Sequence, residues 1–398
     1  MDTLFKNKDI GYFTLYTITT CLIFETSIFA VFLYSRGIVY SHIAYLFSIY
    51  ALSVFIFEYI TGVVADRYSR KAVLIGASVS LIIGESIFLL GTNLYILALG
   101  MIFMAFSVAS RSGADIAYIY GKIESGKSEI TFDKYISNLN SLTFILTAVA
   151  CVIGSFIAEF KLELPMIITA ISYLISIMFL VKFKETNNSK NTKKRESIIN
   201  NNIKLVFSNR RVLVLILIGI ILMPGYHLFF TLLQPYLESN NVDIKYFGIL
   251  YFVFTIFESI GAKLTPYINK NINSSNLILL IGFLVGLTYM VMFLKGIYFI
   301  IIPLIVMGLV YGVYYTINSI KINQLIKNEE RASIISLQHA LGKLVQFIIL
   351  TASGLLISNT SLRFTLLTIG IFIILMVIIL CLSFKSLNEY KEELEELV

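Results

Sequence analysis

Long runs of apolar residues are the feature that most constrains how this chain of 398 residues folds. About twelve runs, each roughly 20 residues long, follow one another along the sequence. An α-helix of that length spans the roughly 30 Å hydrocarbon core of a bilayer and satisfies its own backbone hydrogen bonds, as lipid requires. The runs lack the alternation of transmembrane barrel strands. They predict an all-α membrane protein with about twelve transmembrane helices.

The expected helices fall into two groups of six, separated by a polar stretch. They cover about residues 11–34, 41–65, 71–91, 94–120, 137–160, 165–183, 212–237, 246–268, 276–294, 298–326, 332–357 and 362–384. We therefore divide the chain into an N-terminal six-helix half (1–183), a basic linker (184–211), a C-terminal six-helix half (212–384) and an acidic tail (385–398). We interpret the linker as a flexible tether, with binding of anionic lipids as the alternative.

The placement of charge predicts the orientation of the helices. Only 14% of residues are charged and 58% are hydrophobic, and the net charge is +7. In a soluble protein such an excess of positive charge would suggest nucleic acid as a partner. Here the lysines and arginines gather in alternate loops, near residues 67–71, 122–134, 270 and 321–331. The positive-inside rule makes these loops, the linker and both termini cytoplasmic. We expect a multi-pass protein of the cell membrane, and the richness in Ile, Asn and Lys suggests a bacterium.

Several ionisable residues lie inside the apolar runs, where a charge is unfavourable and is by default a functional hypothesis. The candidates for proton coupling or substrate binding are Glu58, Glu258, Glu25, Glu85, Lys343 and His227. Desolvation favours the protonated form of a carboxyl group, so such an acid can carry a proton and can attract a cation. Glu58 and Glu258 come first because Ile56-Phe57-Glu58 is echoed by Ile256-Phe257-Glu258. The alternative is that each acid pairs with a base such as Lys343 and only locks helix packing.

A charged turn separates the second apolar run from the third. It contains Gly62, Asp66, Arg67, Arg70 and Lys71, and a later stretch reads Ser112-Gly113-Ala114-Asp115. The turn resembles the loop signature of the major facilitator superfamily (MFS), with Ser69 where that family usually has Gly. The later stretch resembles a drug-efflux-like subgroup of it. The resemblance implies the MFS fold of two pseudo-symmetric halves, and a cytoplasmic latch formed by these residues together with Asp115.

These observations predict a secondary active transporter that works by alternating access. Proton-coupled efflux of small amphipathic or cationic compounds is the favoured activity, as in a multidrug antiporter. A proton-coupled importer of a small nutrient is the alternative, because the Pro-Gly-rich signature of antiporters is absent from residues 137–160. We expect a monomer whose partners are a small-molecule substrate, protons and membrane lipids, without nucleic acid.

Classes other than transporters find less support in the sequence. A membrane-embedded transferase would need a nucleophile with its base, a metal-ligand cluster or a phosphate-binding loop, and the sequence contains none of these patterns. The three cysteines, Cys21, Cys151 and Cys381, lie in separate apolar runs and do not indicate a disulfide or a metal site. We therefore expect no enzyme activity, no cofactor and no metal. A further alternative is a relative of transporters that no longer transports.

Overall fold

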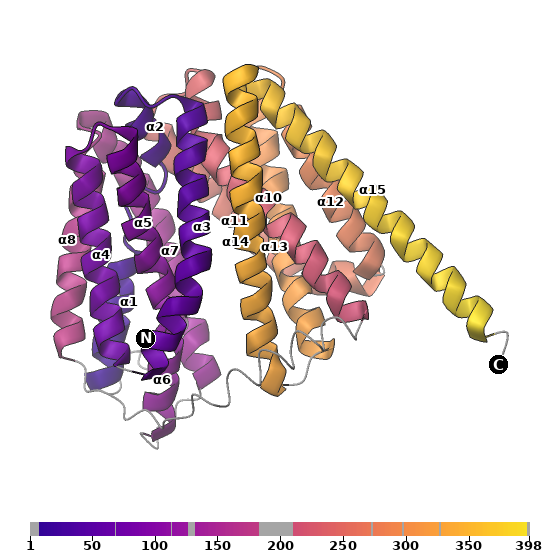
Figure 1. Cartoon of the computed structure of the whole chain (residues 1–398), viewed down its shortest axis with the longest axis horizontal. Coiled ribbons are helices and arrows are strands. Elements are labelled where there is room, and N and C mark those ends of the chain that lie inside the picture. Colours follow the sequence, from indigo (N-terminus) through magenta and orange to yellow (C-terminus); the bar gives the residue numbers. More distant parts are fainter. Residues whose placement is uncertain are drawn as a thin grey trace.

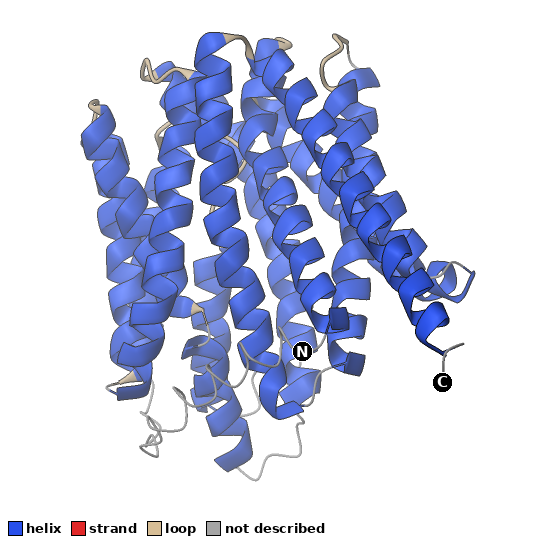
Figure 2. Ribbon diagram, turned by 45° about the vertical axis from the view of Figure 1, so that its right-hand side comes forward, coloured by secondary structure: helices blue, strands red, loops and turns tan. Residues whose placement is uncertain are grey.

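The computed structural model describes residues 8–67, 69–112, 114–125, 132–182, 210–271, 274–296, 298–325 and 328–395. Every regular element in these ranges is an α-helix (Figure 2). The helices are α1 (Lys8–Cys21), α2 (Phe29–Ser35), α3 (Tyr40–Arg67), α4 (Arg70–Leu90), α5 (Leu94–Arg111), α6 (Ala114–Ser125), α7 (Phe132–Phe160), α8 (Leu164–Val181), α10 (Arg210–Ser239), α11 (Lys245–Asn271), α12 (Ser274–Val291), α13 (Tyr298–Leu325), α14 (Asn328–Asn359) and α15 (Leu362–Glu395).

Ten of the described helices are long and apolar enough to cross a membrane. The other two expected spans are the consecutive pair α1 and α2, and α12, whose apolar part Leu279–Val291 is shorter. The predicted all-α membrane fold is confirmed, and twelve remains the predicted number of spans. The linker at 184–211 lies outside the described residues except where α10 begins, and α15 continues as one helix from the last apolar run to Glu395.

The helices form two sets that repeat the same packing (Figure 1). In the first set, α1 to α8, α3 packs on α5 and α4 on α8; in the second, α10 to α15, α11 packs on α13 and α12 on α15. Close backbone approach in the α11–α13 pair depends on glycine, because a Cβ atom at Gly312 would collide with the carbonyl oxygen of Glu258. The two sets, called the two halves below, meet along α3 with α14 and α7 with α11.

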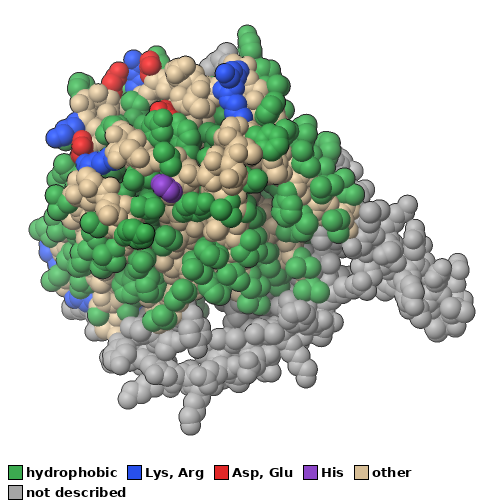
Figure 3. All heavy atoms as spheres, turned by 45° about the horizontal axis from the view of Figure 1, so that its top comes forward, with side chains coloured by type: hydrophobic (Ala, Val, Ile, Leu, Met, Phe, Trp, Pro, Cys, Tyr) green, Lys and Arg blue, Asp and Glu red, His purple; other side chains and the backbone are tan. Residues whose placement is uncertain are grey.

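The outer surface of the bundle is apolar. Large hydrophobic side chains lie open on it: Leu90 is 84% exposed, Tyr95 83% and Phe160 87%. Figure 3 shows hydrophobic side chains over much of the flank, with the visible acidic side chains gathered near one end. A soluble monomer rarely exposes so large an apolar area, whereas a membrane protein presents it to lipid.

Two expected helices are interrupted. The span expected at 11–34 stops at Cys21 and resumes at Phe29, so residues 22–28, which include Glu25, are not helical. The span expected at 94–120 is divided after Arg111 into α5 and α6. Neither interruption contains a proline, and the first contains no glycine. Hydropathy predicts where a chain crosses the membrane, but a break depends on neighbouring helices that can satisfy the freed backbone groups.

Candidate functional site

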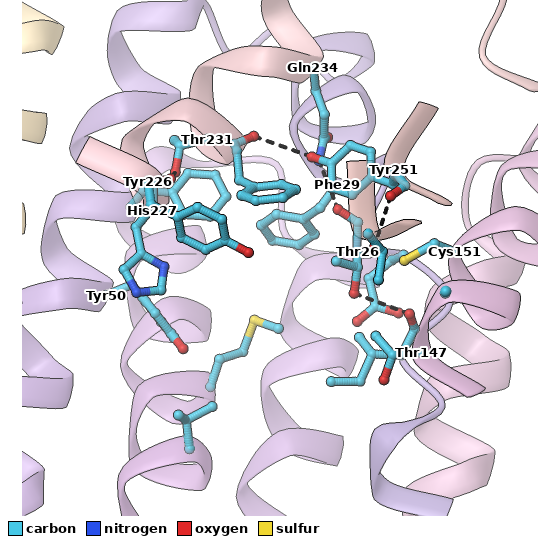
Figure 4. Close-up of a pocket in the computed structure, with 18 of the residues that line it drawn as sticks. Thr26, Phe29, Tyr50, Thr147, Cys151, Tyr226, His227, Thr231, Gln234 and Tyr251 are labelled. Atoms are coloured by element: carbon cyan, nitrogen blue, oxygen red, sulfur yellow. Dashed lines mark hydrogen bonds between the residues drawn. The ribbon is translucent and has the colours of Figure 1, made fainter. Parts of the chain in front are cut away.

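A cavity of about 500 Å³ lies between the two halves (Figure 4). Its wall combines the broken segment at 22–28 with residues of α2, α3, α4, α5, α7, α8, α10, α11 and α14. The volume falls within the roughly 300–1,000 Å³ of small-molecule sites. Because both halves contribute to the wall, any movement of one half against the other changes the shape of the cavity.

Most of the wall is apolar and aromatic. The first half supplies Phe29, Phe47, Met101 and Met104, and α10 supplies Tyr226 and Phe230. Tyr226 stacks on Tyr311 of α13 with ring centroids 3.4 Å apart, and Phe230 contacts Tyr251 at 5.1 Å. Aromatic and methionine side chains adapt to ligands of different shape, so the wall suits a flat or amphipathic molecule.

Four of the six ionisable candidates line this cavity: Glu25, Glu258, Lys343 and His227. Glu258 lies close enough to Tyr226 and Tyr311 to interact electrostatically with the hydroxyl groups of both rings. The Lys343 ammonium donates a hydrogen bond of 3.0 Å to Gln346, one turn away on α14. The cavity therefore contains two carboxyl groups and one ammonium group, and could hold a cation beside a carboxylate.

The other two candidates are not among the residues that line the cavity. Glu58 on α3 is half-buried and interacts electrostatically with Lys343 on α14, across the boundary between the halves. Glu85 on α4 is fully buried and faces Glu25. The sequence predicted each of these groups, but the contacts between distant helices that pair them could not be read from it.

The broken segment is held by side chains from other helices. The hydroxyl of Thr169 on α8 accepts the Phe24 N–H at 2.9 Å, and the Thr147 hydroxyl on α7 donates to the Cys21 carbonyl at 3.2 Å. Before the break, the Thr20 carbonyl accepts hydrogen bonds from Arg111 on α5 and from the Tyr173 hydroxyl on α8. These bonds replace those that a continuous helix would make within itself.

Gln234 on α10 completes this arrangement from the opposite half. Its amide nitrogen donates to the Thr26 carbonyl at 2.8 Å and to the Tyr251 hydroxyl at 3.0 Å, and its amide oxygen accepts the Ala30 N–H at 2.7 Å. Ala30 lies in the first turn of α2, where a backbone N–H has no partner in its own helix. Figure 4 shows Gln234, Thr26 and Tyr251 together at one side of the cavity.

One end of the cavity is closed by contacts between the halves. We call it the short-loop end, because the loops at 36–39, 91–93, 161–163, 240–244, 292–296 and 360–361 lie there, and we call the opposite end the basic-loop end. At the short-loop end Lys245 pairs with Glu159 at 3.3 Å, and Ser155 donates to the Lys245 carbonyl at 3.1 Å. The hydrogen bonds of Gln234 join the halves on the same side of the cavity.

Two glycines allow the halves to touch at the short-loop end. A Cβ atom at Gly248 of α11 would collide with the backbone of α7 at Cys151, and one at Gly354 of α14 would collide with the Tyr45 ring of α3. Both positions are buried. The contact surface is therefore closely fitted, and any larger residue would hold the halves apart.

The predicted latch is only partly within the described residues. The surroundings of Gly62 and the side chains of Asp66 and Arg67 lie outside them, so their contacts remain a prediction. Arg70 and Lys71 begin α4, and the Lys71 ammonium donates to the Val181 carbonyl at the end of α8 at 2.7 Å. Asp115 is half-buried in the first turn of α6.

Sequence reasoning missed several wall residues. Gln234, Tyr226 and Tyr251 belong to apolar helices and carry no charge that would single them out. A buried amide in a membrane helix is a weak signal of such a contact, since it must find hydrogen-bond partners. In the ranges that the structure describes, no group of three or more His, Cys, Asp or Glu is placed to hold a metal ion.

Comparison with known proteins places the chain among transporters. The family profile of the Major Facilitator Superfamily matches residues 10–348. An uncharacterized MFS-type transporter, YxaM of Bacillus subtilis (strain 168), is 22% identical over 231 residues, which are 56% of this chain and 57% of that protein. The alignment thus spans little more than half of that relative.

Solved structures share the fold over nearly the whole chain. The nucleoside transporter NupG superposes with a TM-score of 0.76 at 13% identity, covering 95% of this chain and 99% of that one. An auto-inhibited POT family peptide transporter superposes with a TM-score of 0.75 at 10% identity, covering 95% and 97%. At such low identity these likenesses establish the fold alone.

Proposed function

Because the chain belongs to the Major Facilitator Superfamily, and so is a membrane transporter of that type, we propose that it exports small amphipathic or cationic compounds in exchange for protons. The observation that carries this proposal is the cavity between the halves, apolar and aromatic over most of its wall and containing two carboxyl groups against one ammonium. Aromatic faces attract cations, and carboxylates neutralise them.

Alternating access is supported by where the halves touch. The short-loop end is closed by the Gln234 contacts and the Lys245–Glu159 pair. The positive-inside rule predicts that the basic loops are cytoplasmic. The closed short-loop end would then seal the cavity from the outside of the cell. Rocking of the halves about the cavity would break these contacts and expose the substrate to the outside.

Proton coupling is proposed to act through the charges at the boundary of the halves. Glu58 on α3 and Lys343 on α14 attract each other only while the two helices stay together. Protonation of Glu58 removes that attraction and leaves the Lys343 charge to repel a cationic substrate. Binding of a proton and binding of a cation would thus oppose each other, which is what an exchanger requires.

The second candidate is uptake of a polar nutrient. Gln234, Gln346 and Thr231 line the cavity and could form hydrogen bonds with a neutral or zwitterionic solute, and Lys343 could bind its carboxylate. The proteins that share the fold include nucleoside and peptide transporters. Nucleosides and short peptides therefore belong in any substrate screen.

The remaining features of the proposal follow from the family and the sequence. We place the protein in the cell membrane of a bacterium, with both termini in the cytoplasm. It would act as a monomer whose partners are membrane lipids and protons. The latch at Asp66, Arg67, Arg70 and Asp115 would close the cytoplasmic end when the short-loop end opens.

Proton movement in sealed vesicles containing the purified protein tests the proposal. A panel of cationic and neutral drugs is added to wild type, to Glu58→Gln and to a control, Glu163→Gln, whose carboxylate pairs with Arg36 near the surface. We expect drug-induced proton movement in wild type and control and its loss in Glu58→Gln. Movement that persists in Glu58→Gln would exclude Glu58 from coupling. A response to nucleosides or peptides in place of drugs would favour the second candidate.

A further inference from the structure

The broken segment brings two glutamates from different parts of the first half into contact. Glu25 lies in residues 22–28, and Glu85 lies on α4, in the last two turns before that helix ends at Leu90. Their carboxyl groups are within hydrogen-bonding reach of each other. Glu25 is 2% exposed and Glu85 is 0% exposed. Glu25 also lines the cavity, whereas Glu85 does not, so the pair extends from the cavity into the first half.

Very few donors reach these carboxyl groups. The Thr169 hydroxyl donates to Oε2 of Glu25, while it accepts the Phe24 N–H. Oε1 of Glu25 and both oxygens of Glu85 are buried and have no hydrogen-bond partner among the protein's own donors. Buried carboxylate oxygens are usually well supplied with donors. A carboxyl group facing another one can form a hydrogen bond only if one of the two holds a proton.

Among the described residues, no basic side chain balances the pair. The titratable groups that face it are Tyr173 on α8 and Cys151 on α7, which are neutral as phenol and thiol. Arg111 of α5 is a cation on an adjoining helix, and its guanidinium donates to the Tyr173 hydroxyl at 2.5 Å and to the Thr20 carbonyl. It interacts electrostatically with Tyr173, Tyr16, Asp115 and Cys21, and neither glutamate is among these partners.

We propose that Glu25 and Glu85 are a proton-binding pair that holds one shared proton, and that this pair, which extends from the cavity wall into the first half, is a second site, besides Glu58, at which transport is coupled to protons. The inference rests on the proposed function and deepens it. Two buried carboxylates in contact, without a cation, repel each other strongly, and one proton between them turns the repulsion into a hydrogen bond. The proton would reach the pair from the cavity through Glu25.

The same segment connects the pair to the closed end of the cavity. The carbonyl of Thr26, which is next to Glu25, accepts a hydrogen bond from the Gln234 side chain of the opposite half. The Ala30 N–H donates a hydrogen bond to the same side chain. When the shared proton leaves, the two negative charges push Glu25 away from α4, and the segment that carries Thr26 moves with it. Loss of the proton thus weakens the contacts that close the short-loop end.

Infrared difference spectroscopy of the purified protein in lipid vesicles tests the pair directly. A protonated carboxyl group has a C=O stretching band that a carboxylate lacks. Spectra of Glu85→Gln are subtracted from those of wild type over a pH series, with Glu163→Gln as the control. We expect a band in the wild-type difference that disappears at high pH and is absent from the control difference, because the amide introduced by Glu85→Gln would supply Glu25 with a donor in place of the proton. Absence of any such band would overturn the proposal.

Two further measurements keep the result clear. In Thr169→Val the band should move in frequency, because that variant removes the hydroxyl that donates to Glu25; an unmoved band would assign the proton elsewhere. Replacement of choline by sodium in the buffer at constant pH should leave the band unchanged. Disappearance of the band in sodium would show that the pair binds sodium in place of the proton. The spectra need no substrate, so failure of drug-induced proton movement in vesicles would remove the proposed function while leaving the pair standing.

Discussion

The helices that open the two halves differ in an instructive way. The first, α1 and α2, is broken at residues 22–28, which contain neither proline nor glycine. Its counterpart α10 contains Pro224 and Pro235 and still runs as one helix from Arg210 to Ser239. Local sequence would place the interruption in α10. The observed break instead lies where Thr169, Thr147, Arg111 and Gln234 accept or supply hydrogen bonds.

In α10, by contrast, a donor from another helix contacts the residue after Pro224. The Tyr289 hydroxyl of α12 donates to the Gly225 carbonyl at 2.5 Å. This bond adds outside support beside Pro224, whereas the carbonyl that Pro224 itself frees lies one turn earlier, at Ile220. In this protein, polar partners on neighbouring helices therefore determine where a membrane helix is interrupted more than helix-breaking residues do.

Replacement of Gln234, which supports the broken helix, should lower the free energy of unfolding more than the other substitutions below. Gln234→Leu removes the partner of the buried Ala30 N–H and of the part-buried Thr26 carbonyl. We expect a loss of about 2–3 kcal/mol in the free energy of unfolding in mixed micelles, together with increased labelling of cysteines placed at the short-loop end. Thr288→Val, which removes a hydroxyl bonded within α12, is the matched control. Equal effects of the two variants would show that Gln234 does not hold the break.

Replacement of Arg111 tests the other side of the break. Arg111→Gln removes a charged donor from the Thr20 carbonyl and the Tyr173 hydroxyl. We expect a loss of about 1.5–2 kcal/mol, because hydrogen bonds to charged groups contribute more than neutral ones. Arg111→Lys should recover part of it. If unfolding of Arg111→Gln matched that of wild type, the segment before the break would need another support.

Tyr289→Phe should weaken the intact helix only modestly. The variant removes one neutral hydrogen bond to the Gly225 carbonyl and keeps the ring in its buried position. We expect a loss of about 1 kcal/mol, measured by the same unfolding assay. A loss larger than that of Gln234→Leu would reverse the comparison, because α10 would then depend on outside support more than the broken helix does.

Pro224→Ala should have the smallest effect. Alanine restores a backbone N–H, which favours the helix, but it also frees the unfolded chain, which opposes that gain. We expect unfolding free energies within about 0.5 kcal/mol of wild type. A gain well above this value would mean that the proline strains α10 and is retained for another reason.

The sequence predicted the membrane helices and the ionisable residues of the cavity because both depend on local composition. Apolar runs are long enough to identify one by one, and a Glu or Lys inside such a run is conspicuous, as Glu25, Glu258 and Lys343 were. The break at 22–28, the role of Gln234 and the facing of Glu25 and Glu85 depend on which helices pack together. Such contacts join residues far apart in the chain, and periodicity within one helix cannot reveal them.

The measurement that most directly tests alternating access is the distance between spin labels across the halves at both ends. After replacement of Cys21, Cys151 and Cys381, one label pair is placed at Tyr95 and Tyr298 of the short-loop end and another at Ala72 and Leu264 of the basic-loop end, all four of them exposed. We expect two states in lipid, with the first distance increasing as the second decreases when pH or substrate is changed. Distances that stay fixed, or that increase together, would contradict it.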